Sequence, residues 1–455
     1  MNNIKEFLYR KNKKETGVPY AEILSRVQQH IAKEQSEALL AAAKQQDASE
    51  LLRRCIMDCI INEGLSTDEC ESVSELSDRL FKDMAEYSFL TDTLKQTGVE
   101  EININSWDDT EIITKDGYRK LSQSFASSSH SVDVTRRMLA VSNMVLDDTS
   151  PIALGHLSKN IRIASLKSPI VDEDVGIASS IRIVNPDKLT TGQLIQSGTA
   201  TEEMLEFLKL CVCYGVSLCF AGATSSGKTT AAGWLLSTIP YNKRIFSIEE
   251  GSRELDIVVR DENGRVKNRV VSTKTRPSDN PRYNVSQDDL LDVSLRFDPD
   301  IIAVGEMRGV EAFSAQEAAR TGHTVVTTIH SNSCESTYRR MMTLAKRKYD
   351  MEDDTLMGLM VEAFPIIAYC RQLEDRSRKI TEIIETEGYR NGNLAYRSLY
   401  RYIVEDNEEV DGEIKIIGRF ERGNGISDVL YSAMLRNGAP KSRLDRFKRK
   451  LEVKM

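Results

Sequence analysis

The chain has 455 residues, of which 40% are hydrophobic and 29% charged, and its formal net charge is −8. This composition is typical of a globular protein and excludes the fibrous and disordered classes. The length predicts two or three domains, and the acidic balance argues against a surface that coats nucleic acid.

The cysteines and the apolar segments bear on location. None of the eight cysteines forms a C-x-x-C pair or a metal-ligand cluster in the sequence, so we expect reduced thiols of a cytosolic protein and no structural zinc. No apolar stretch approaches the ~18 residues of a membrane span, and the first residues lack the apolar core of a signal peptide. Any membrane role is therefore expected to be peripheral.

Residues 1–96 are expected to form a helical extension. Ile23, Val27 and Ile31 recur every four residues, and the later segment EALLAAAK is rich in strong helix formers. Both ends of the chain carry clusters of lysine and arginine. Such clusters are either solvated helix ends or contacts to an anionic membrane or partner.

Residues 97–187 are predicted to form an α/β domain. Apolar and polar residues alternate around Ile102 and Ile104, and Asp116-Gly117 is a hairpin signal. Residues 188–198 are expected to be a linker, because NPDKLTTGQLIQSG carries Pro186, Gly192 and Gly198 between two periodic regions.

Residues 199–385 repeat a strand, loop and helix pattern, which predicts a parallel sheet covered by helices. The expected strands include VSLCFAG, RIFSIEE, DIIAVGE and HTVVTTIH. A polar excursion at 259–275 indicates a hairpin with its turn at Asn263-Gly264. Residues 386–455 mix hairpin-like and helical pieces and close on a basic helix, so we expect a C-terminal subdomain there.

The strongest local signal is GATSSGKTT, which fits the phosphate-binding pattern G-x-x-x-x-G-K-[ST] between a predicted strand and a predicted helix. Backbone N–H groups of such a loop point at phosphate oxygens, and the helix offers its positive N-terminus. Lys228 is expected to reach the β- and γ-phosphates and Thr229 to ligate Mg²⁺. The predicted nucleotide-binding residues are Gly222, Ala223, Thr224, Ser225, Ser226, Gly227, Lys228, Thr229 and Thr230.

Three further strand ends carry side chains that nucleotide hydrolysis would need. Glu249 and Glu250 end one strand, Glu306 ends another, and His330 ends a third. In a parallel sheet these carboxyl ends lie at the edge where the phosphate-binding loop opens. Any one of them alone is as readily an exposed charge, but the set together with the loop predicts one site for ATP.

These residues carry a resemblance. The loop, the tripeptide IEE and the run LRFDPDIIAVGEMRGVEAFSAQEAARTGHTVVTTIHS closely resemble the secretion ATPase superfamily that powers type II secretion, type IV pili and type IV secretion. The segments GVEEININSWDD, KNIRIAS and SSIRIVNPDKLT are similar to the N-terminal domain of its CpaF-like branch, which serves tight-adherence (Flp-type) pili and has conjugation relatives. The resemblance covers about residues 97–385.

The resemblance implies roles for particular residues. Glu306 would be the Walker B acid, acting on water or on the Mg²⁺ shell. Glu249 would be the catalytic glutamate, and His330 would contact the γ-phosphate. Arg162 and Arg182 of the N-terminal domain would reach the nucleotide as arginine fingers do. The family usually has Glu-Asp where this chain has two glutamates, which leaves open which of the two is the base.

Together these features predict a RecA-like P-loop ATPase core with an N-terminal α/β domain and an N-terminal helical extension. By resemblance, we expect a Mg²⁺-dependent ATPase that forms a homo-hexameric ring in the cytoplasm, peripheral to the inner membrane. Its partner would be a polytopic inner-membrane platform protein of a pilus or secretion system.

Two alternatives remain. A conjugative DNA-transfer or DNA-stimulated RecA-like motor would share the fold, although the acidic balance disfavours nucleic acid as a partner. A regulator or scaffold that hydrolyses ATP slowly would have no need of Glu249, Glu306 and His330 together.

Overall fold

The computed structural model describes residues 9, 17–34, 48–114, 117–158, 160–183, 189–250, 254–276, 280–410 and 412–448. Contacts divide the chain into two compact units, Met1–Asn185 and Pro186–Met455, which are described separately below. None of the helices in these ranges is long and apolar enough to cross a membrane.

The N-terminal unit begins with a helical cluster. Its helices are α2 (Tyr20–Glu34), α4 (Ala48–Asn62), α5 (Val73–Ala85) and α6 (Leu90–Thr93). The apolar positions that recur every four residues, Ile23, Val27 and Ile31, are buried in its core. Ser72 starts α5 by accepting a hydrogen bond from the backbone N–H of Glu75. The basic cluster at residues 10–14 lies outside the described ranges.

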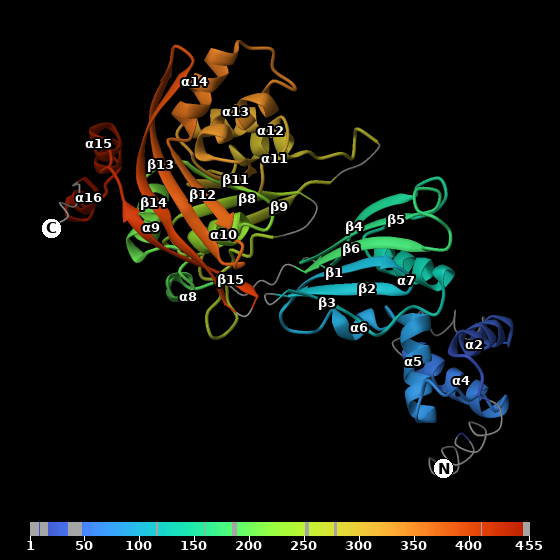
Figure 1. The fold of residues 1–455 in the computed structure, drawn as a ribbon. Coiled ribbons are helices and arrows are strands. Elements are labelled where there is room, and N and C mark those ends of the chain that lie inside the picture. The colour runs from blue at the N-terminus through green and yellow to red at the C-terminus, as the bar shows by residue number, and fades with distance from the viewer. Residues whose placement is uncertain are drawn as a thin grey trace. The chain divides into compact units, whose positions relative to one another are not determined.

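The rest of this unit is a six-stranded antiparallel sheet in the order β3-β2-β1-β6-β5-β4 (Figure 1). The strands are β1 (Val99–Ser106), β2 (Asp109–Thr114), β3 (Gly117–Lys120), β4 (Ile152–Ser158), β5 (Ile161–Lys167) and β6 (Ile177–Ile183). Ile102 and Ile104 share a hydrophobic core with α7 (Ser128–Ala140), which explains the alternation in the sequence. Thr114 pairs with Gly117, so β2 and β3 form the predicted hairpin.

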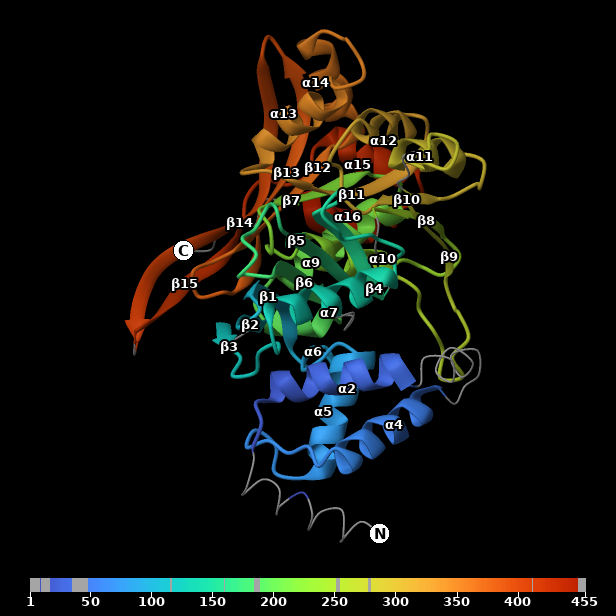
Figure 2. The ribbon, with the colours of Figure 1, turned by 90° about the vertical axis from the view of Figure 1, so that its right-hand side faces the viewer.

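The second unit is built on a nine-stranded sheet in the order β15-β14-β13-β12-β7-β11-β10-β8-β9. The strands are β7 (Leu218–Gly222), β8 (Arg244–Glu249), β9 (Arg269–Lys274), β10 (Ile301–Val304), β11 (Thr324–His330), β12 (Ile366–Gln372), β13 (Arg378–Arg390), β14 (Asn393–Val410) and β15 (Glu413–Arg422). Strands β12 to β9 along this order are parallel, as in the predicted RecA-like core. Strands β13, β14 and β15 continue it in antiparallel fashion, and β14 and β15 form one long curved ribbon (Figure 2).

Helices cover both faces of the parallel part (Figure 1). They are α8 (Thr191–Gln196), α9 (Glu202–Cys213), α10 (Lys228–Ser237), α11 (Gln287–Ser294), α12 (Glu311–Arg320), α13 (Cys334–Ala345), α14 (Asp353–Ala363), α15 (Asp428–Arg436) and α16 (Lys441–Lys448). In β7, Leu218 and Phe220 join the core with α9 and α10, whereas Cys219 and Ala221 join the core with α11 to α14. Burial on both faces explains why these strands are continuous apolar runs in the sequence.

Three segments differ from the expectation drawn from sequence. The segment expected as a linker contains α8, because Thr190 and Gln193 form a capping box at its start. The excursion at 259–275 does turn where expected, with the Gly264 N–H donating to Asp261 O, but its second half is β9, a parallel edge strand beside β8. The boundary expected between residues 385 and 386 falls within β13.

The basic C-terminal helix packs on the core through ion pairs. Arg443 and Arg446 of α16 each contact a carboxylate oxygen of Glu206 on α9, at 3.1 and 2.8 Å. Lys448 lies 3.0 Å from Asp428. These three cations therefore have intramolecular partners. This favours a helix that serves the fold over a helix that contacts a membrane.

Candidate active site

The phosphate-binding loop connects β7 to α10 at residues 222–230, and its backbone has an unusual conformation. Ser225 and Gly227 have φ values of 60° and 90°, in the left-handed region that favours glycine. A Cβ on Gly222 would lie 2.1 Å from the carbonyl oxygen of Cys370 on β12, so no larger residue fits between these two strands. The loop geometry thus depends on glycine at two positions and tolerates Ser225 at the third.

Lys228 is the first residue of α10, and its side chain is buried with its ammonium group turned back on the loop. Its Nζ donates a hydrogen bond to Ala223 O at 2.6 Å and lies 3.4 Å from His330 Nδ1. Ser226 Oγ donates to the same carbonyl at 2.7 Å. Of the two threonines that follow, Thr229 is half-buried and Thr230 is exposed. Lys228 is therefore held against the backbone of its own loop and next to His330.

Strand pairing brings the other predicted residues to this loop. His330 at the end of β11 pairs with Gly222 at the end of β7, and Val304 at the end of β10 pairs with both Thr327 of β11 and Ile248 of β8. The carboxyl ends of these strands therefore share one edge of the sheet, as predicted from their order in the sequence.

The side chains at this edge form a continuous polar chain. His330 Nε2 lies 3.2 Å from Glu306 Oε1, and Arg308 Nη2 donates to Glu306 Oε2 at 2.8 Å. Arg308 also contacts Glu250 Oε2 at 3.2 Å. Lys228 extends this polar chain to the phosphate-binding loop through its contact with His330. The polar chain therefore joins the loop to β11, β10 and β8. Sequence reasoning gives Arg308 no defined role, because only the fold shows that it bridges two carboxylates.

The contacts within this polar chain determine which of its side chains are charged. Burial alone would raise the pKa of Glu306, but the hydrogen bond and charge of Arg308, with the charges of His330 and Lys228, lower that pKa overall. The pKa of His330 is lowered by burial and by the charge of Lys228. Near neutral pH, Glu306 is therefore a carboxylate and His330 a neutral imidazole. A neutral ring suits the contacts, with Nδ1 facing the ammonium group of Lys228 and Nε2 donating to Glu306.

Glu249 and Glu250 have contrasting surroundings. Glu249 is only 3% exposed, and its Oε2 accepts hydrogen bonds from the backbone N–H groups of Glu254 and Leu255, at 2.5 and 2.8 Å. Its Cγ lies against Gly305, where a Cβ would approach to 3.3 Å. The side chain of Glu250 is 52% exposed and pairs with Arg308. The first glutamate is thus fixed by the backbone, and the second is accessible to solvent and linked to Glu306.

Two groups that sequence reasoning missed position the site. The carboxylate of Glu311, which is buried, accepts hydrogen bonds from the backbone N–H groups of Arg308 and Gly309, at 2.5 and 2.7 Å, and so fixes the turn that presents Arg308. Arg378 of β13 donates from Nε to Ser225 O at 2.9 Å, which ties the phosphate-binding loop to a distant strand. Neither contact follows from a local motif, because the partners are brought together by the turn after β10 and by strand order.

Arg162 and Arg182 lie in the N-terminal unit, on β5 and β6. They occupy directly paired positions, Arg182 also pairs with Glu101 of β1, and Arg162 with His156 of β4. Directly paired residues point to the same face of a sheet, so these side chains form one row across four strands. The structure brings the two arginines together with each other, while their approach to the nucleotide stays a prediction.

The geometry suits a phosphate ester and a divalent cation. The loop presents Lys228 and a helix N-terminus to an anion, and Glu306 offers an ionised, 20% exposed carboxylate at the same edge of the sheet. Hydroxyl and carboxylate oxygens are the ligands that Mg²⁺ takes at nucleotide sites.

The part of the chain that holds these residues is similar to known proteins. Residues 136–396, more than half of the chain, match the family described as "Type II/IV secretion system protein". The chain is 32% identical over 244 residues to the uncharacterized protein MJ0900 of Methanocaldococcus jannaschii. This match covers 54% of this chain but only 42% of MJ0900. It is 25% identical over 329 residues to the type IV secretion system protein VirB11 of Bartonella quintana, covering 64% of this chain and 89% of that protein. It is 29% identical over 266 residues to the conjugal transfer protein TrbB of Rhizobium radiobacter, covering 57% of this chain and 75% of that protein.

Proposed function

Since the chain belongs to the type II/IV secretion system protein family, we propose that it is an ATP-hydrolysing ring motor that powers a pilus or secretion machine at the inner membrane. The observation that carries the proposal is the polar chain from Lys228 through His330 and Glu306 to Arg308, at the edge where the phosphate-binding loop opens. A protein that only bound nucleotide would need the loop but not an ionised carboxylate joined to it.

Each residue of this polar chain has a task in hydrolysis. Lys228 neutralises charge on the β- and γ-phosphates, and the helix N-terminus behind it does the same. Neutral His330 lies next to Lys228 and donates to Glu306, so it can respond to the γ-phosphate and pass that response to the carboxylate. Mg²⁺, when bound with ATP, would be held by Thr229 and by Glu306, directly or through water, and would neutralise phosphate charge.

The general base is one of two glutamates. Glu249 takes this role by the family resemblance, and its side chain lies against Gly305 in a site of low exposure. Glu250 is the exposed alternative, and it reaches Glu306 through Arg308. We favour Glu249, because a base fixed by two backbone N–H groups is held in one orientation, and orientation contributes strongly to catalysis.

The paired arginines of the N-terminal unit would complete the site. Arg162 and Arg182 place two guanidinium groups at directly opposed positions, and Glu101 is paired with Arg182 on the next strand. Arginine fingers accelerate the hydrolysis of a triphosphate by about 10³-fold or more elsewhere, and two neighbouring arginines suit that role. A closed homo-hexamer would supply the charges across subunit interfaces. Its partner would be a polytopic inner-membrane platform protein, with the ring peripheral on the cytoplasmic face. The CpaF-like branch, serving Flp-type pili, is the proposed assignment within the family.

A DNA-transfer motor is the second candidate. The similarity to a conjugal transfer protein over 57% of the chain favours it. It predicts an ATPase rate that rises with DNA and falls steeply with salt, because phosphate contacts release counterions. The net charge of −8 and the intramolecular pairing of the basic C-terminal helix argue against it.

The test is steady-state ATP hydrolysis by the purified protein with Mg²⁺, as a function of protein concentration and without DNA or lipid. We expect the rate per subunit to rise cooperatively as the ring assembles, because each site is completed by a neighbour. A rate per subunit that does not change with concentration would contradict the self-assembling ring. A rate that is absent until DNA is added would favour the DNA-transfer candidate.

A further inference from the structure

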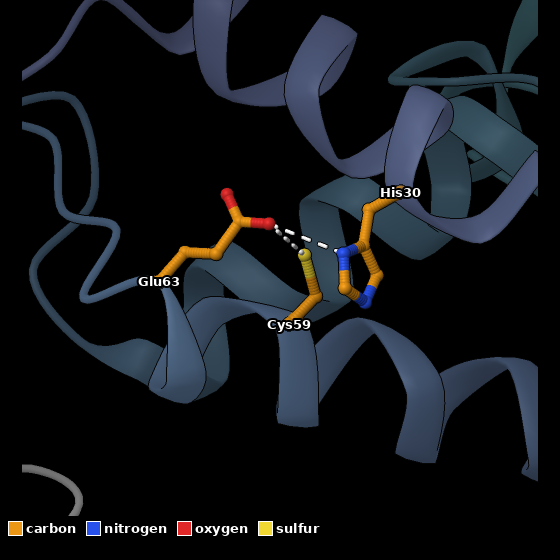
Figure 3. A group of neighbouring side chains, drawn as sticks. All are labelled: His30, Cys59 and Glu63. Carbon is orange, nitrogen blue, oxygen red and sulfur yellow. Dashed lines mark hydrogen bonds and ion pairs between the residues drawn. The ribbon is translucent and has the colours of Figure 1, made fainter. Parts of the chain in front are cut away.

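A second cluster of reactive side chains lies in the helical part of the N-terminal unit. His30 of α2, Cys59 of α4 and Glu63, which directly follows α4, point toward one another from two helices (Figure 3). His30 Nδ1 lies 3.2 Å from Glu63 Oε1, and Cys59 Sγ donates to the same oxygen at 3.7 Å. Sulfur, nitrogen and oxygen atoms all lie within 4.8 Å of one another.

These separations match those of ligands around a tetrahedral metal ion. With zinc bonds of about 2.0–2.1 Å to nitrogen and oxygen and about 2.3 Å to sulfur, tetrahedral angles place N and O about 3.3 Å apart and O and S about 3.6 Å apart. The observed 3.2 and 3.7 Å agree with both values. An ion midway between the three groups would therefore find two of its three ligand pairs already at bonding geometry.

The chemistry of the donors selects the ion. A thiolate and an imidazole favour zinc over Mg²⁺ or Ca²⁺, which take oxygen ligands. A thiolate, a carboxylate and a neutral imidazole together also balance the two positive charges of the ion, which matters because Cys59 is buried. We propose that His30, Cys59 and Glu63 bind Zn²⁺, with water in the fourth position.

Such a site would join α2 to α4. The two helices share a small hydrophobic core, and small cores benefit from a metal cross-link. Cys59 lies in α4 and Glu63 lies four residues further on, directly after the helix, whereas α2 supplies the third ligand. The sequence has no C-x-x-C pair, so it gives no reason to expect zinc. The site uses one cysteine, and its partners are adjacent only after α2 and α4 have packed.

The test uses the full chain without nucleotide and Co²⁺ as a spectroscopic substitute for Zn²⁺. We expect one Co²⁺ per chain, with a sulfur-to-metal charge-transfer band that Zn²⁺ removes by displacement. Cys59→Ser should abolish the band, and His30→Gln and Glu63→Gln should weaken metal binding by more than about tenfold. Cys55→Ser is the matched control, because Cys55 is a buried cysteine of the same helix outside the cluster, and it should keep the band.

A band that persists in Cys59→Ser, or no band in the unmodified chain, would overturn the proposal. Because Cys59 is buried, its substitution could disturb the fold, so thermal unfolding with Zn²⁺ and with a chelator is measured in parallel. His30 and Glu63 are partly exposed and provide variants that fold. Zn²⁺ should raise the unfolding temperature of the unmodified chain and not that of His30→Gln. An equal rise in both would place the ion elsewhere and contradict the site.

Discussion

His330 Nε2 at the end of β11 lies 3.2 Å from Oε1 of Glu306, two residues beyond the end of β10. The same imidazole faces Lys228 through its other ring nitrogen. A single residue therefore connects the cation that would hold the phosphates to the carboxylate that would act on water or on the Mg²⁺ shell. This arrangement predicts that binding and hydrolysis can be separated by substitution at Glu306.

The first prediction concerns Glu306→Gln. The substitution keeps the size and one hydrogen-bond acceptor but removes the charge, so ATP affinity should stay close to that of the unmodified protein. The rate of hydrolysis should fall about 10²-fold or more. Nucleotide titration and steady-state hydrolysis measure the two effects. Glu362→Gln, at a 64% exposed carboxylate paired with Arg320, is the control and should change neither. A Glu306→Gln variant with normal turnover would remove this residue from the mechanism.

The second prediction separates the two glutamates at the end of β8. Glu249→Gln replaces an acceptor of two backbone N–H bonds in a buried position, so it should lower the free energy of unfolding by about 1–3 kcal/mol. Glu250→Gln breaks an exposed pair with Arg308 and should cost less than about 1 kcal/mol. Chemical denaturation measures both. If Glu249 is the base, its variant also loses hydrolysis at temperatures where it remains folded; a loss confined to Glu250→Gln would assign the role to Glu250.

The third prediction is a pH dependence of stability. Burial and Lys228 lower the pKa of His330, so between that pKa and the ordinary value of about 6.5 the unfolded chain binds a proton that the folded chain does not. The contribution of neutral His330 to the free energy of unfolding is thus fully present above about pH 6.5. It is lost as the pH falls through the pKa that His330 has in the folded protein. Glu306, whose pKa is also lowered, acts in the same direction but only below its ordinary value of about 4.3.

The measurement for this third prediction is the unfolding temperature of the unmodified chain and of His330→Gln from about pH 8 to about pH 5. The unmodified chain should lose more stability over this range than the variant. Parallel curves for the two proteins would show that another group causes the dependence.

The fourth prediction concerns the close approach of β7 and β12. Gly222→Ala would place a Cβ 2.1 Å from Cys370 O at a φ of 150°, so the free energy of unfolding should fall by about 3 kcal/mol or more. Gly358→Ala is the matched control, because this glycine lies within α14 with open space around its Cβ position. The control should be stabilised by about 0.5–1 kcal/mol. Thermal unfolding compares the two, and equal stability would contradict the predicted clash.

Local patterns in the sequence predict the loop and the strand ends well. GATSSGKTT and the apolar runs before Glu249, Glu306 and His330 are contiguous signals, and parallel order brings them to one edge. The Arg308 bridge, the Arg378 contact and the Glu311 support could not be predicted. Each depends on a turn or a register that joins distant segments, and no local spacing records it. The edge strand β9 was read as half of a hairpin for the same reason, since its partner is β8 and not its own neighbour in sequence.

The hydrogen bond from Lys228 to its own loop fixes the ammonium group before any anion binds. An ammonium group has three N–H donors, so Lys228 can keep its bond to Ala223 O and still donate to a phosphate oxygen. The side chain therefore loses little conformational freedom when an anion binds, and a group that is already ordered pays less for binding.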